Sequence, residues 1–425
     1  MRSRPFGLYV HYPWCSFRCP YCDFAVTTAR QLSGSRYADA VVAEIGRRAA
    51  GFRGRPCATL FLGGGTPSLW DAESIARVVE AARGLGLPRG AEVTLEANPE
   101  SADARRAAAW REAGVTRVSI GVQSFDPVVL RKLGRRHGPE DAERAIREVA
   151  AVIPNVSVDL IHGARRSSVA TARADALRVA SLPVTHVSSY ALTLDADVLA
   201  EDVPFARLAR QGKLSFPGED DVVAQERAIL EALGAAGFRR YEISNLARPG
   251  FESRHNLLYW RSDDYLGAGA GAVGCVRSEE GGVRWTNHRT VGPWLAAVES
   301  GGLPTASEEV LDARAIRNEA VMLGLRTAEG FDVARLGPGK ATEVEALVRG
   351  GLAVVRGGRL RLTPAGMDVH SAIAERLFEG GASGCDHECG ECAPLDSTLD
   401  SSAKQAASGR LVDGDAVIRS LLTRK

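Results

Sequence analysis

The first 240 or so residues repeat one local pattern, in which a short β-branched run is followed by an amphipathic helical stretch. Such strand–helix repeats imply a parallel sheet with right-handed crossovers. Six units predict a partial barrel or an open wound sheet, with the functional site at the carboxyl ends of the strands. The runs expected to form strands are "GLYVHY" (7–12), "ATLFLGG" (58–64), "EVTLEAN" (92–98), "RVSIGVQ" (117–123), "VSVDLIHG" (156–163) and "HVSSYALT" (186–193).

The stretches between these runs have helical spacing. Tyr37, Val41 and Ile45 recur at intervals of four residues, and Pro139 stands where a first-turn proline belongs. A further helix is expected over 222–233, where apolar residues again recur at this spacing. The chain is therefore expected to belong to the α/β class, with a partial (β/α)6 barrel over residues 1–240.

Beyond residue 240 the pattern changes. Residues 241–305 are irregular and glycine-rich, with "RHNLLYWRSDDYLGAGAGAVG" at their centre. Over 306–378, two short strands around "RGGR" and a following helix predict a small C-terminal winged-helix-like α+β module. Residues 379–425 contain no aromatic residue and are expected to be mostly disordered, apart from their cysteines.

Charge and composition exclude several classes of function. Lys and Arg number 53 against 52 Asp and Glu, so no overall field would attract nucleic acid or an acidic membrane. No run of about 18 uncharged apolar residues is present, and "MRSRPFGLYVHYPWC" lacks the apolar region of a signal peptide. We therefore expect a cytoplasmic protein with no integral membrane segment and no nucleic-acid partner.

Three of the eight cysteines lie in "WCSFRCPYCDF", directly after the first expected strand. In a reducing compartment, clustered cysteines are more often metal ligands or redox groups than disulfides. The spacing of Cys15, Cys19 and Cys22 suits a four-iron cluster held by three thiolates, which leaves one iron without a protein ligand. Two alternatives stay open: zinc, with His11 as a doubtful fourth ligand, and unligated or redox-active thiols.

Glycine or polar residues also end the other expected strands. "GGGTPS" (63–68) ends the second strand, and its glycines allow a ligand to approach the backbone. Glu96, Gln123 and Asp159 lie near the ends of the third, fourth and fifth strands, where buried parallel strands are usually apolar. Each could be a satisfied structural group, but all three lie on the edge that carries the cysteines.

Taken together, these segments resemble the radical SAM superfamily, in the branch of the oxygen-independent coproporphyrinogen III dehydrogenases and the HemW heme chaperones. The resemblance covers about residues 6–378 and implies a partial (β/α)6 barrel of the radical SAM type. It also implies that the three cysteines hold a [4Fe-4S] cluster whose fourth iron is chelated by S-adenosylmethionine. The segments that carry it are "YVHYPWCSFRCPYCDF", "GGGTPS", "EANPE", "SIGVQSFD", "LGRRHG", "VDLIHG" and "HNLLYW".

The resemblance implies cofactor roles for individual residues near the cysteines. Tyr9 and Tyr21 are similar to residues beside the cluster and the cofactor. Gly65 and Thr66 are similar to the strand end that meets the methionine amino group. Glu96 resembles the acidic residue that hydrogen-bonds the cofactor.

Three further positions resemble the lining of a pocket for a second cofactor molecule in the dehydrogenase. They are Gln123, Arg135 and Asp159. Their residue types suit the ligand, because a sulfonium cation and ribose hydroxyls attract carboxylates and a cofactor carboxylate attracts arginine.

Two features favour the chaperone branch over the dehydrogenase. Phe24 stands where the dehydrogenase usually has a further cysteine, and "HNLLYW" (255–260) matches the HNxxYW signature of the chaperones. The imidazole of His255 is a suitable axial ligand for heme iron, and flat aromatic residues can stack on a porphyrin. The alternative is that His255 and Asn256 hold an irregular loop through backbone hydrogen bonds.

The sequence departs from the family at two places. Val273 follows Gly271 and Ala272 where the chaperones usually have a histidine, and Ala164-Arg165 follows "VDLIHG" where Leu-Pro is usual. These departures put the heme ligands and the rim of the pocket in doubt. They do not affect the cluster ligands.

The tail segment "CDHECGEC" repeats the C-x3-C-x2-C spacing with Cys385, Cys389 and Cys392, and His387 lies between the first two. Three readings stay open: a site for zinc or another soft metal, an inert tail, and a second cluster. No counterpart in the family accounts for it.

The sequence thus predicts a heme chaperone of the HemW type that binds a [4Fe-4S] cluster, S-adenosylmethionine and heme, and that transfers heme to acceptor proteins. The alternative is a radical SAM enzyme that oxidatively decarboxylates coproporphyrinogen III. A third reading is a zinc-binding α/β protein without radical chemistry. The oligomeric state, including a homodimer, stays open.

Overall fold

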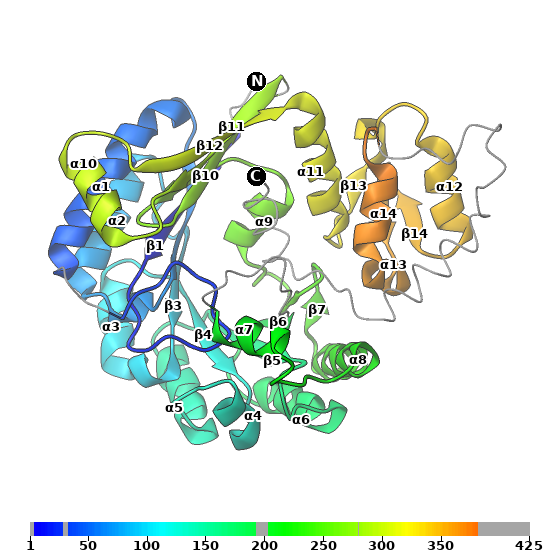
Figure 1. Ribbon diagram of the computed structural model, residues 1–425, viewed down its shortest axis with the longest axis horizontal. Coiled ribbons are helices and arrows are strands. Elements are labelled where there is room, and N and C mark those ends of the chain that lie inside the picture. Colours follow the sequence, from blue (N-terminus) through cyan, green and yellow to red (C-terminus); the bar gives the residue numbers. More distant parts are fainter. Residues whose placement is uncertain (1–3, 29–32, 193–202, 279, 381–425) are drawn as a thin grey trace.

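The computed structural model describes residues 4–28, 33–192, 203–278 and 280–380. Within these residues, twelve strands form one sheet in the order β12-β11-β10-β9-β1-β2-β3-β4-β5-β6-β8-β7 (Figure 1). The strands are β1 (Phe6–Tyr12), β2 (Cys57–Gly64), β3 (Glu92–Ala97), β4 (Arg117–Gln123), β5 (Val156–His162), β6 (His186–Ala191), β7 (Arg239–Arg240), β8 (Asn245–Ala247), β9 (Tyr265–Ala268), β10 (Val273–Arg277), β11 (Gly281–Asn287) and β12 (Thr305–Asp312).

The strands β1 to β6 pair in parallel and in chain order, as the strand–helix repeats predict. All six expected strands are confirmed, and the chain has the expected α/β class of fold. Helices cover the outside of the sheet (Figure 1). The helices between β1 and β7 are α1 (Gly34–Arg48), α2 (Ala72–Gly84), α3 (Ala104–Glu112), α4 (Pro127–Lys132), α5 (Pro139–Ala150), α6 (Val169–Ala180), α7 (Pro204–Arg210) and α8 (Glu219–Ala235).

The outer helices each turn an apolar face to the core. In α1, Tyr37, Val41 and Ile45 are fully buried, as their spacing predicts. Ser33 caps the start of this helix, because its hydroxyl accepts a hydrogen bond from the Arg36 N–H at 3.2 Å. Complete burial of an aliphatic side chain such as Ile45 stabilises the fold by roughly 2 kcal/mol. This packing fixes the helices, and hence the loops that leave the carboxyl ends of the strands.

The sheet continues past β1 through strands that the sequence pattern did not predict. β9 pairs in parallel with β1, and β10, β11 and β12 follow as antiparallel strands. A Cβ atom on Gly267 would lie 1.9 Å from the Val273 carbonyl oxygen, and one on Gly274 would lie 2.0 Å from the Trp285 ring. The glycines that obscure the strand pattern are therefore the residues that allow these strands to pack. Two helices lie in the same region: α9 (Arg254–Trp260) and α10 (Val291–Glu299).

The C-terminal part of the described chain forms a small α+β module with its own apolar core, as the sequence predicts (Figure 1). Gly357 and Gly358 have φ values of 57° and 73° and form the tight turn between its two longer strands. The strands lie in the order β13-β15-β14. The elements are α11 (Ala313–Leu325), β13 (Phe331–Asp332), α12 (Ala341–Arg349), β14 (Ala353–Arg356), β15 (Arg359–Leu362), α13 (Pro364–Asp368) and α14 (His370–Leu377).

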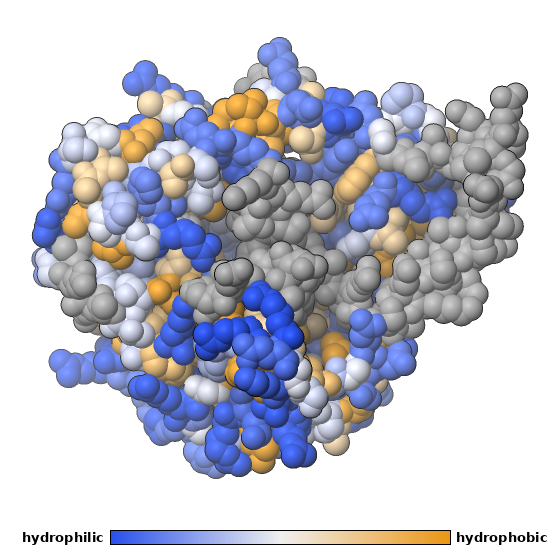
Figure 2. All heavy atoms as spheres, in the orientation of Figure 1, coloured by the Kyte–Doolittle hydropathy of each residue, from blue (hydrophilic) through white to orange (hydrophobic). Residues whose placement is uncertain are grey.

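The surface is mixed in polarity. Figure 2 shows hydrophilic residues over much of the visible face, with hydrophobic residues in scattered spots. In the part of the chain that the structure describes, no helix combines the length and the apolar character needed to cross a membrane. The tail cysteines Cys385, Cys389 and Cys392, and with them the predictions made for the tail, lie outside the described residues.

Candidate metal and cofactor site

The three cysteines of the N-terminal loop follow β1 at the carboxyl edge of the barrel. Cys15, Cys19 and Cys22 are each partly exposed. The Cys22 N–H donates a hydrogen bond of 3.1 Å to the Cys19 carbonyl oxygen and forms a turn between the two thiols. Burial raises the pKa of Cys15 and raises the pKa of Cys22 to about 12. A bound metal ion would reverse this effect, because it stabilises the thiolate form.

The glycine-rich turn after β2 packs directly on the cysteine loop. The Gly65 N–H donates to the Tyr12 carbonyl oxygen at 2.7 Å, and the Thr66 N–H donates to the Trp14 carbonyl oxygen at 2.9 Å. A Cβ atom on Gly65 would lie 2.7 Å from the Trp14 oxygen, so only glycine fits this contact. The sequence predicts that a ligand approaches the backbone of this turn. In the structure, the backbone of the cysteine loop makes such a close approach at Gly65.

Thr66 and Arg135 donate hydrogen bonds to cysteine sulfurs. The Thr66 hydroxyl lies 3.5 Å from Cys15 Sγ, and Arg135 Nη1 lies 3.4 Å from Cys19 Sγ. The buried Nε of Arg135 has no hydrogen-bond partner among the residues that the structure describes. A partly buried guanidinium is stabilised by nearby negative charge. The Glu100 carboxylate supplies some of it, and thiolates bound to iron would add more beside the sulfurs.

The residues present therefore fit a cluster held by three thiolates, since the donor set is sulfur and its hydrogen bonds come from a cation and a hydroxyl. Within the described residues, no group of three or more His, Cys, Asp or Glu side chains is already drawn together in the geometry of a metal site. The three cysteines share one loop, in which Thr66 donates to Cys15 and Arg135 donates to Cys19.

His11, weighed as a fourth ligand for zinc, already has partners for both ring nitrogens. Its Nδ1 lies 2.9 Å from the Tyr9 hydroxyl, and its Nε2 lies 2.9 Å from the Ala25 carbonyl oxygen. Burial lowers the pKa of His11 to about 4, so the ring is neutral at pH 7. In this arrangement His11 positions Tyr9 and the cysteine loop, and it presents no nitrogen to a metal.

The expected cofactor residues of the strand ends lie in the same part of the barrel. Glu96 Oε2 accepts a hydrogen bond of 3.0 Å from the Gly64 N–H, which joins the ends of β3 and β2. Asp159 Oδ1 accepts one of 3.1 Å from the Ser119 hydroxyl. Gln123 has a φ of 70° and follows a register shift between β4 and β5. Bulges and left-handed residues of this kind redirect side chains beside functional sites.

Tyr21 lies within the cysteine loop, between Cys19 and Cys22. It contacts a small apolar cluster that includes Val129, Leu133 and Ala164. Burial raises the pKa of Tyr21, so the phenol stays protonated at neutral pH. Ala164, one of the positions that depart from the family pattern, is fully buried in this cluster.

The "HNLLYW" segment forms α9 and lies at the opposite end of the strands. The Glu92 carboxylate, at the start of β3, accepts hydrogen bonds of 2.9 Å from the N–H groups of Arg254 and His255. His255 Nδ1 lies 2.8 Å from Thr59 Oγ1, and Nε2 lies 2.9 Å from the Tyr259 hydroxyl. The side chain is 1% exposed.

Both ring nitrogens of His255 thus have hydrogen-bond partners within the protein, as the structural alternative for this residue expects. Burial lowers its pKa to about 3, so the ring is neutral. Trp260 is also buried, beneath the Arg326 guanidinium at 4.5 Å from the ring centroid. Heme contact by His255 stays a prediction. Ligation of heme iron through Nε2 would require the hydrogen bond between Nε2 and the Tyr259 hydroxyl to break.

Sequence reasoning did not single out Asn98, which follows β3. Its Oδ1 accepts a hydrogen bond of 2.6 Å from Arg135 Nη2, and its Nδ2 donates one of 3.2 Å to Thr66 Oγ1. Asn98 thus contacts both residues that donate to the cysteine sulfurs. The available signal was its place inside "EANPE", immediately after Glu96 and Ala97.

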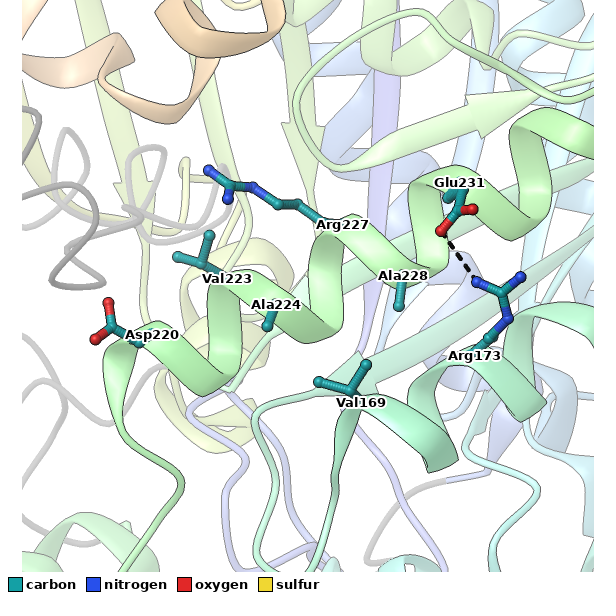
Figure 3. Close-up of a pocket in the computed structure, with 8 residues that line it drawn as sticks. All are labelled: Val169, Arg173, Asp220, Val223, Ala224, Arg227, Ala228 and Glu231. Atoms are coloured by element: carbon teal, nitrogen blue, oxygen red, sulfur yellow. Dashed lines mark hydrogen bonds and ion pairs between the residues drawn. The ribbon is translucent and has the colours of Figure 1, made fainter.

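A surface pocket lies between α6 and α8, on the outside of the barrel (Figure 3). An ion pair of 3.0 Å between Arg173 and Glu231 crosses one end of it. Ala224, Ala228 and Val169 form its floor and wall. Its described lining includes no cysteine and none of the predicted cofactor residues, so the cysteine loop remains the candidate site.

Known proteins resemble the chain along most of its length. Residues 9–171 match the family model described as the Radical SAM superfamily, and residues 311–369 match the HemN C-terminal domain. Heme chaperone HemW of Mycobacterium tuberculosis is 39% identical over 384 residues, which cover 89% of this chain and 96% of that protein. Heme chaperone HemW of Escherichia coli is 36% identical over 283 residues, which cover 65% of this chain and 72% of that protein.

The fold has a solved counterpart. The structure of the Escherichia coli coproporphyrinogen III oxidase HemN superposes with a TM-score of 0.72 at 21% identity, and covers 89% of this chain and 91% of that one. The cysteine loop on this barrel therefore defines a radical SAM protein. Within that superfamily, the chain belongs to the family of the HemW heme chaperones.

Proposed function

We propose that the protein is a heme chaperone, which binds heme and transfers it to acceptor proteins, and that it carries a [4Fe-4S] cluster and S-adenosylmethionine. The observation that supports this function most strongly is the 39% identity to a curated heme chaperone over 96% of that protein's length. The cysteine loop at the carboxyl end of β1 supports the cofactor assignment.

In this proposal, Cys15, Cys19 and Cys22 hold the cluster through their thiolates. The bound cluster would supply one iron that lacks a protein ligand and that S-adenosylmethionine can chelate. Arg135 and Thr66 stabilise the thiolates by donating hydrogen bonds to sulfur at 3.4 and 3.5 Å.

The cofactor pocket is proposed to extend from the cysteine loop across the ends of β2 to β5. Glu96 offers a carboxylate to a cationic or hydroxyl-bearing ligand while it accepts the Gly64 N–H. Gln123 and Asp159 are proposed to line the far side, where a bulge redirects Gln123. Tyr9, held by His11, is proposed to form the wall next to the cluster.

The proposed heme contact of His255 depends on a change at α9. Because Nε2 lies 2.9 Å from the Tyr259 hydroxyl, coordination of heme iron through this nitrogen requires the hydrogen bond to open. Tyr259→Phe frees Nε2 without a change in the size of the ring. If His255 is an axial ligand, this variant binds heme at least as tightly as the parent protein does.

The second candidate function is that of a coproporphyrinogen III oxidase. The likeness to HemN supports it, but at 21% identity that likeness concerns the fold. Phe24, 42% exposed, occupies the position of the additional cysteine expected in the dehydrogenase.

One anaerobic experiment separates the two functions. The reconstituted protein is titrated with heme, and it is also incubated with coproporphyrinogen III, S-adenosylmethionine and a reductant. The proposed function predicts stoichiometric heme binding, seen as a Soret band that transfers to added apomyoglobin, and no protoporphyrinogen. Formation of protoporphyrinogen with no heme binding would favour the oxidase instead.

A further inference from the structure

Five residues form a continuous chain of hydrogen bonds across the cysteine loop. Thr66 Oγ1 lies 3.5 Å from Cys15 Sγ, and Asn98 Nδ2 lies 3.2 Å from the same oxygen. On the other side, Asn98 Oδ1 accepts from Arg135 Nη2 at 2.6 Å, and Arg135 Nη1 lies 3.4 Å from Cys19 Sγ. One amide side chain thus lies between the donors to two different cysteine sulfurs.

The chemistry of arginine fixes the direction of every bond in this chain. A guanidinium has donors only, so the amide atom that faces Arg135 must be the Asn98 oxygen. The amide NH2 group therefore faces Thr66 and donates to its oxygen. Because the Thr66 oxygen accepts from Asn98, the Thr66 hydroxyl proton is not used in that contact, and it points at Cys15. Both ends of the chain then direct a proton toward sulfur.

Hydrogen bonds to the sulfurs of an iron–sulfur cluster raise its reduction potential, because they stabilise the additional negative charge of the reduced form. Hydrogen bonds in a chain also polarise one another. A hydroxyl that accepts one hydrogen bond, as Thr66 does, therefore becomes a stronger donor in the next. Thr66 and Arg135, which both donate to sulfur, have a common partner in Asn98.

We infer that Asn98 is a positioning residue of the cluster, which holds Thr66 and Arg135 in the orientation that donates to Cys15 and Cys19 and thereby raises the reduction potential. The inference rests on the cluster of the proposed function. Asn98 itself has no contact with sulfur among the hydrogen bonds of the described residues.

A purely structural role for Asn98 leads to a different expectation. The residue begins a turn in which its N–H donates to Ser101 Oγ at 3.3 Å, and Arg135 is also held by the Gly121 carbonyl oxygen at 2.9 Å. If Asn98 only forms this turn, its loss lowers the thermal stability and leaves the potential of the loaded cluster unchanged. Ser101→Ala perturbs the same turn without a contact to either sulfur donor, and it is the matched control.

The test is a redox titration of the anaerobically reconstituted protein, followed by electron paramagnetic resonance. Asn98→Ala is expected to make reduction of the cluster roughly tenfold less favourable, a shift of about 59 mV to lower potential for one electron. Ser101→Ala is expected to keep the parent potential. An unchanged potential in Asn98→Ala would overturn the inference.

Two further variants show whether Asn98 acts through its partners. Thr66→Val removes one sulfur donor, and it is expected to lower the potential by part of the Asn98→Ala shift. In a Thr66→Val, Arg135→Met background, Asn98→Ala should cause no further shift, because the donors it positions are absent. If Asn98→Ala takes up no cluster, Thr66→Val decides alone, and an unchanged potential there overturns the inference.

The failure of the inference differs from the failure of the proposed function. If the parent protein contains iron and sulfide and Asn98→Ala has the same reduction potential as the parent, only the role of Asn98 is refuted. A parent protein that takes up no iron and sulfide refutes the cluster, and with it the proposed cofactor set.

Discussion

The imidazole Nδ1 of His255 lies 2.8 Å from the Thr59 hydroxyl oxygen, so the segment that resembles a heme-binding signature is joined to the start of β2. The second ring nitrogen is engaged by Tyr259, and the ring of Phe61 lies 5.2 Å away between centroids. In this arrangement α9 packs against the amino-terminal ends of β1, β2 and β3. The cysteine loop lies at the other end.

We predict that His255→Ala destabilises the protein by about 3 kcal/mol, because it leaves a cavity and removes hydrogen bonds to the buried Thr59 hydroxyl and the partly buried Tyr259 hydroxyl. Urea unfolding followed by circular dichroism measures this change. Thr59→Val is the matched variant, since it removes one hydrogen bond and leaves the imidazole in place.

Heme titration of the same two variants separates the roles of His255. If the imidazole is structural, both variants lose stability and bind heme with the affinity of the parent protein. A heme affinity that falls at least tenfold in His255→Ala but not in Thr59→Val would instead support the ligand prediction made from the sequence.

The six barrel strands and the cysteine loop could be predicted because their signals are local. Runs such as 117–123 are bounded by turns, and the spacing of Cys15, Cys19 and Cys22 is visible in the sequence itself. β9 to β11 could not be predicted, because glycines at positions such as 267 and 274 replace the alternating apolar residues wherever backbones or rings approach closely. Their strand character comes from pairing with distant segments.

The hydrogen-bond partners of individual site residues could not be predicted from the sequence either. Both partners of the Asn98 side chain come from other parts of the chain, since Thr66 follows β2 and Arg135 follows α4. Likewise, Thr59 lies 196 positions from His255, so nothing near "HNLLYW" indicates that its histidine is enclosed. Motif spacing identifies which residues matter, and tertiary packing decides which atoms they face.

Gly65→Ala is expected to weaken the attachment of the cysteine loop. The added Cβ would lie 2.7 Å from the Trp14 carbonyl oxygen and 2.9 Å from the Tyr12 carbonyl oxygen, so the backbone must shift. We expect a loss of roughly 2 to 3 kcal/mol in the free energy of unfolding, of the size seen for overpacked sites, together with lower cluster uptake. Gly51→Ala is the matched control, because a Cβ there meets nothing within 4 Å. Equal effects of the two substitutions would contradict the account of this turn.

The buried ion pair between Arg326 and Glu242 is expected to join the C-terminal module to the barrel. Arg326 Nε lies 2.7 Å from Glu242 Oε2, and both side chains are almost completely buried. Removal of one partner leaves an uncompensated buried charge, so Arg326→Met should cost about 3 to 5 kcal/mol. The double variant with Glu242→Gln should recover part of this loss. Equal losses in the single and double variants would show that the charges do not interact.

Stability is expected to fall as the pH is lowered from 7 toward 5. Burial, followed by the charge of Arg240 or Arg326, lowers the pKa of His162 and of His370 to about 4, below the unfolded value of 6.5. Between pH 6.5 and 4 the unfolded chain therefore binds more protons, and each such histidine costs up to about 1.4 kcal/mol per pH unit.

Urea unfolding of the parent protein and of His370→Gln at pH 7, 6 and 5 measures this effect. The glutamine can still donate to the Met322 carbonyl oxygen, which accepts from His370 Nε2 at 2.8 Å. We expect the variant to lose less stability per pH unit than the parent below pH 6.5. Parallel pH profiles would contradict the burial of a neutral His370.

The central claim is that the N-terminal cysteine loop holds a [4Fe-4S] cluster, and anaerobic reconstitution with iron and sulfide analysis tests it most directly. The comparison uses the parent protein, a triple Ser variant of Cys15, Cys19 and Cys22, and a triple Ser variant of Cys385, Cys389 and Cys392. The account predicts brown protein with equal iron and sulfide, and an electron paramagnetic resonance signal on reduction, in the parent and in the tail variant only. A colourless parent protein, or a cluster that survives loss of the N-terminal cysteines and disappears with the tail cysteines, would contradict it.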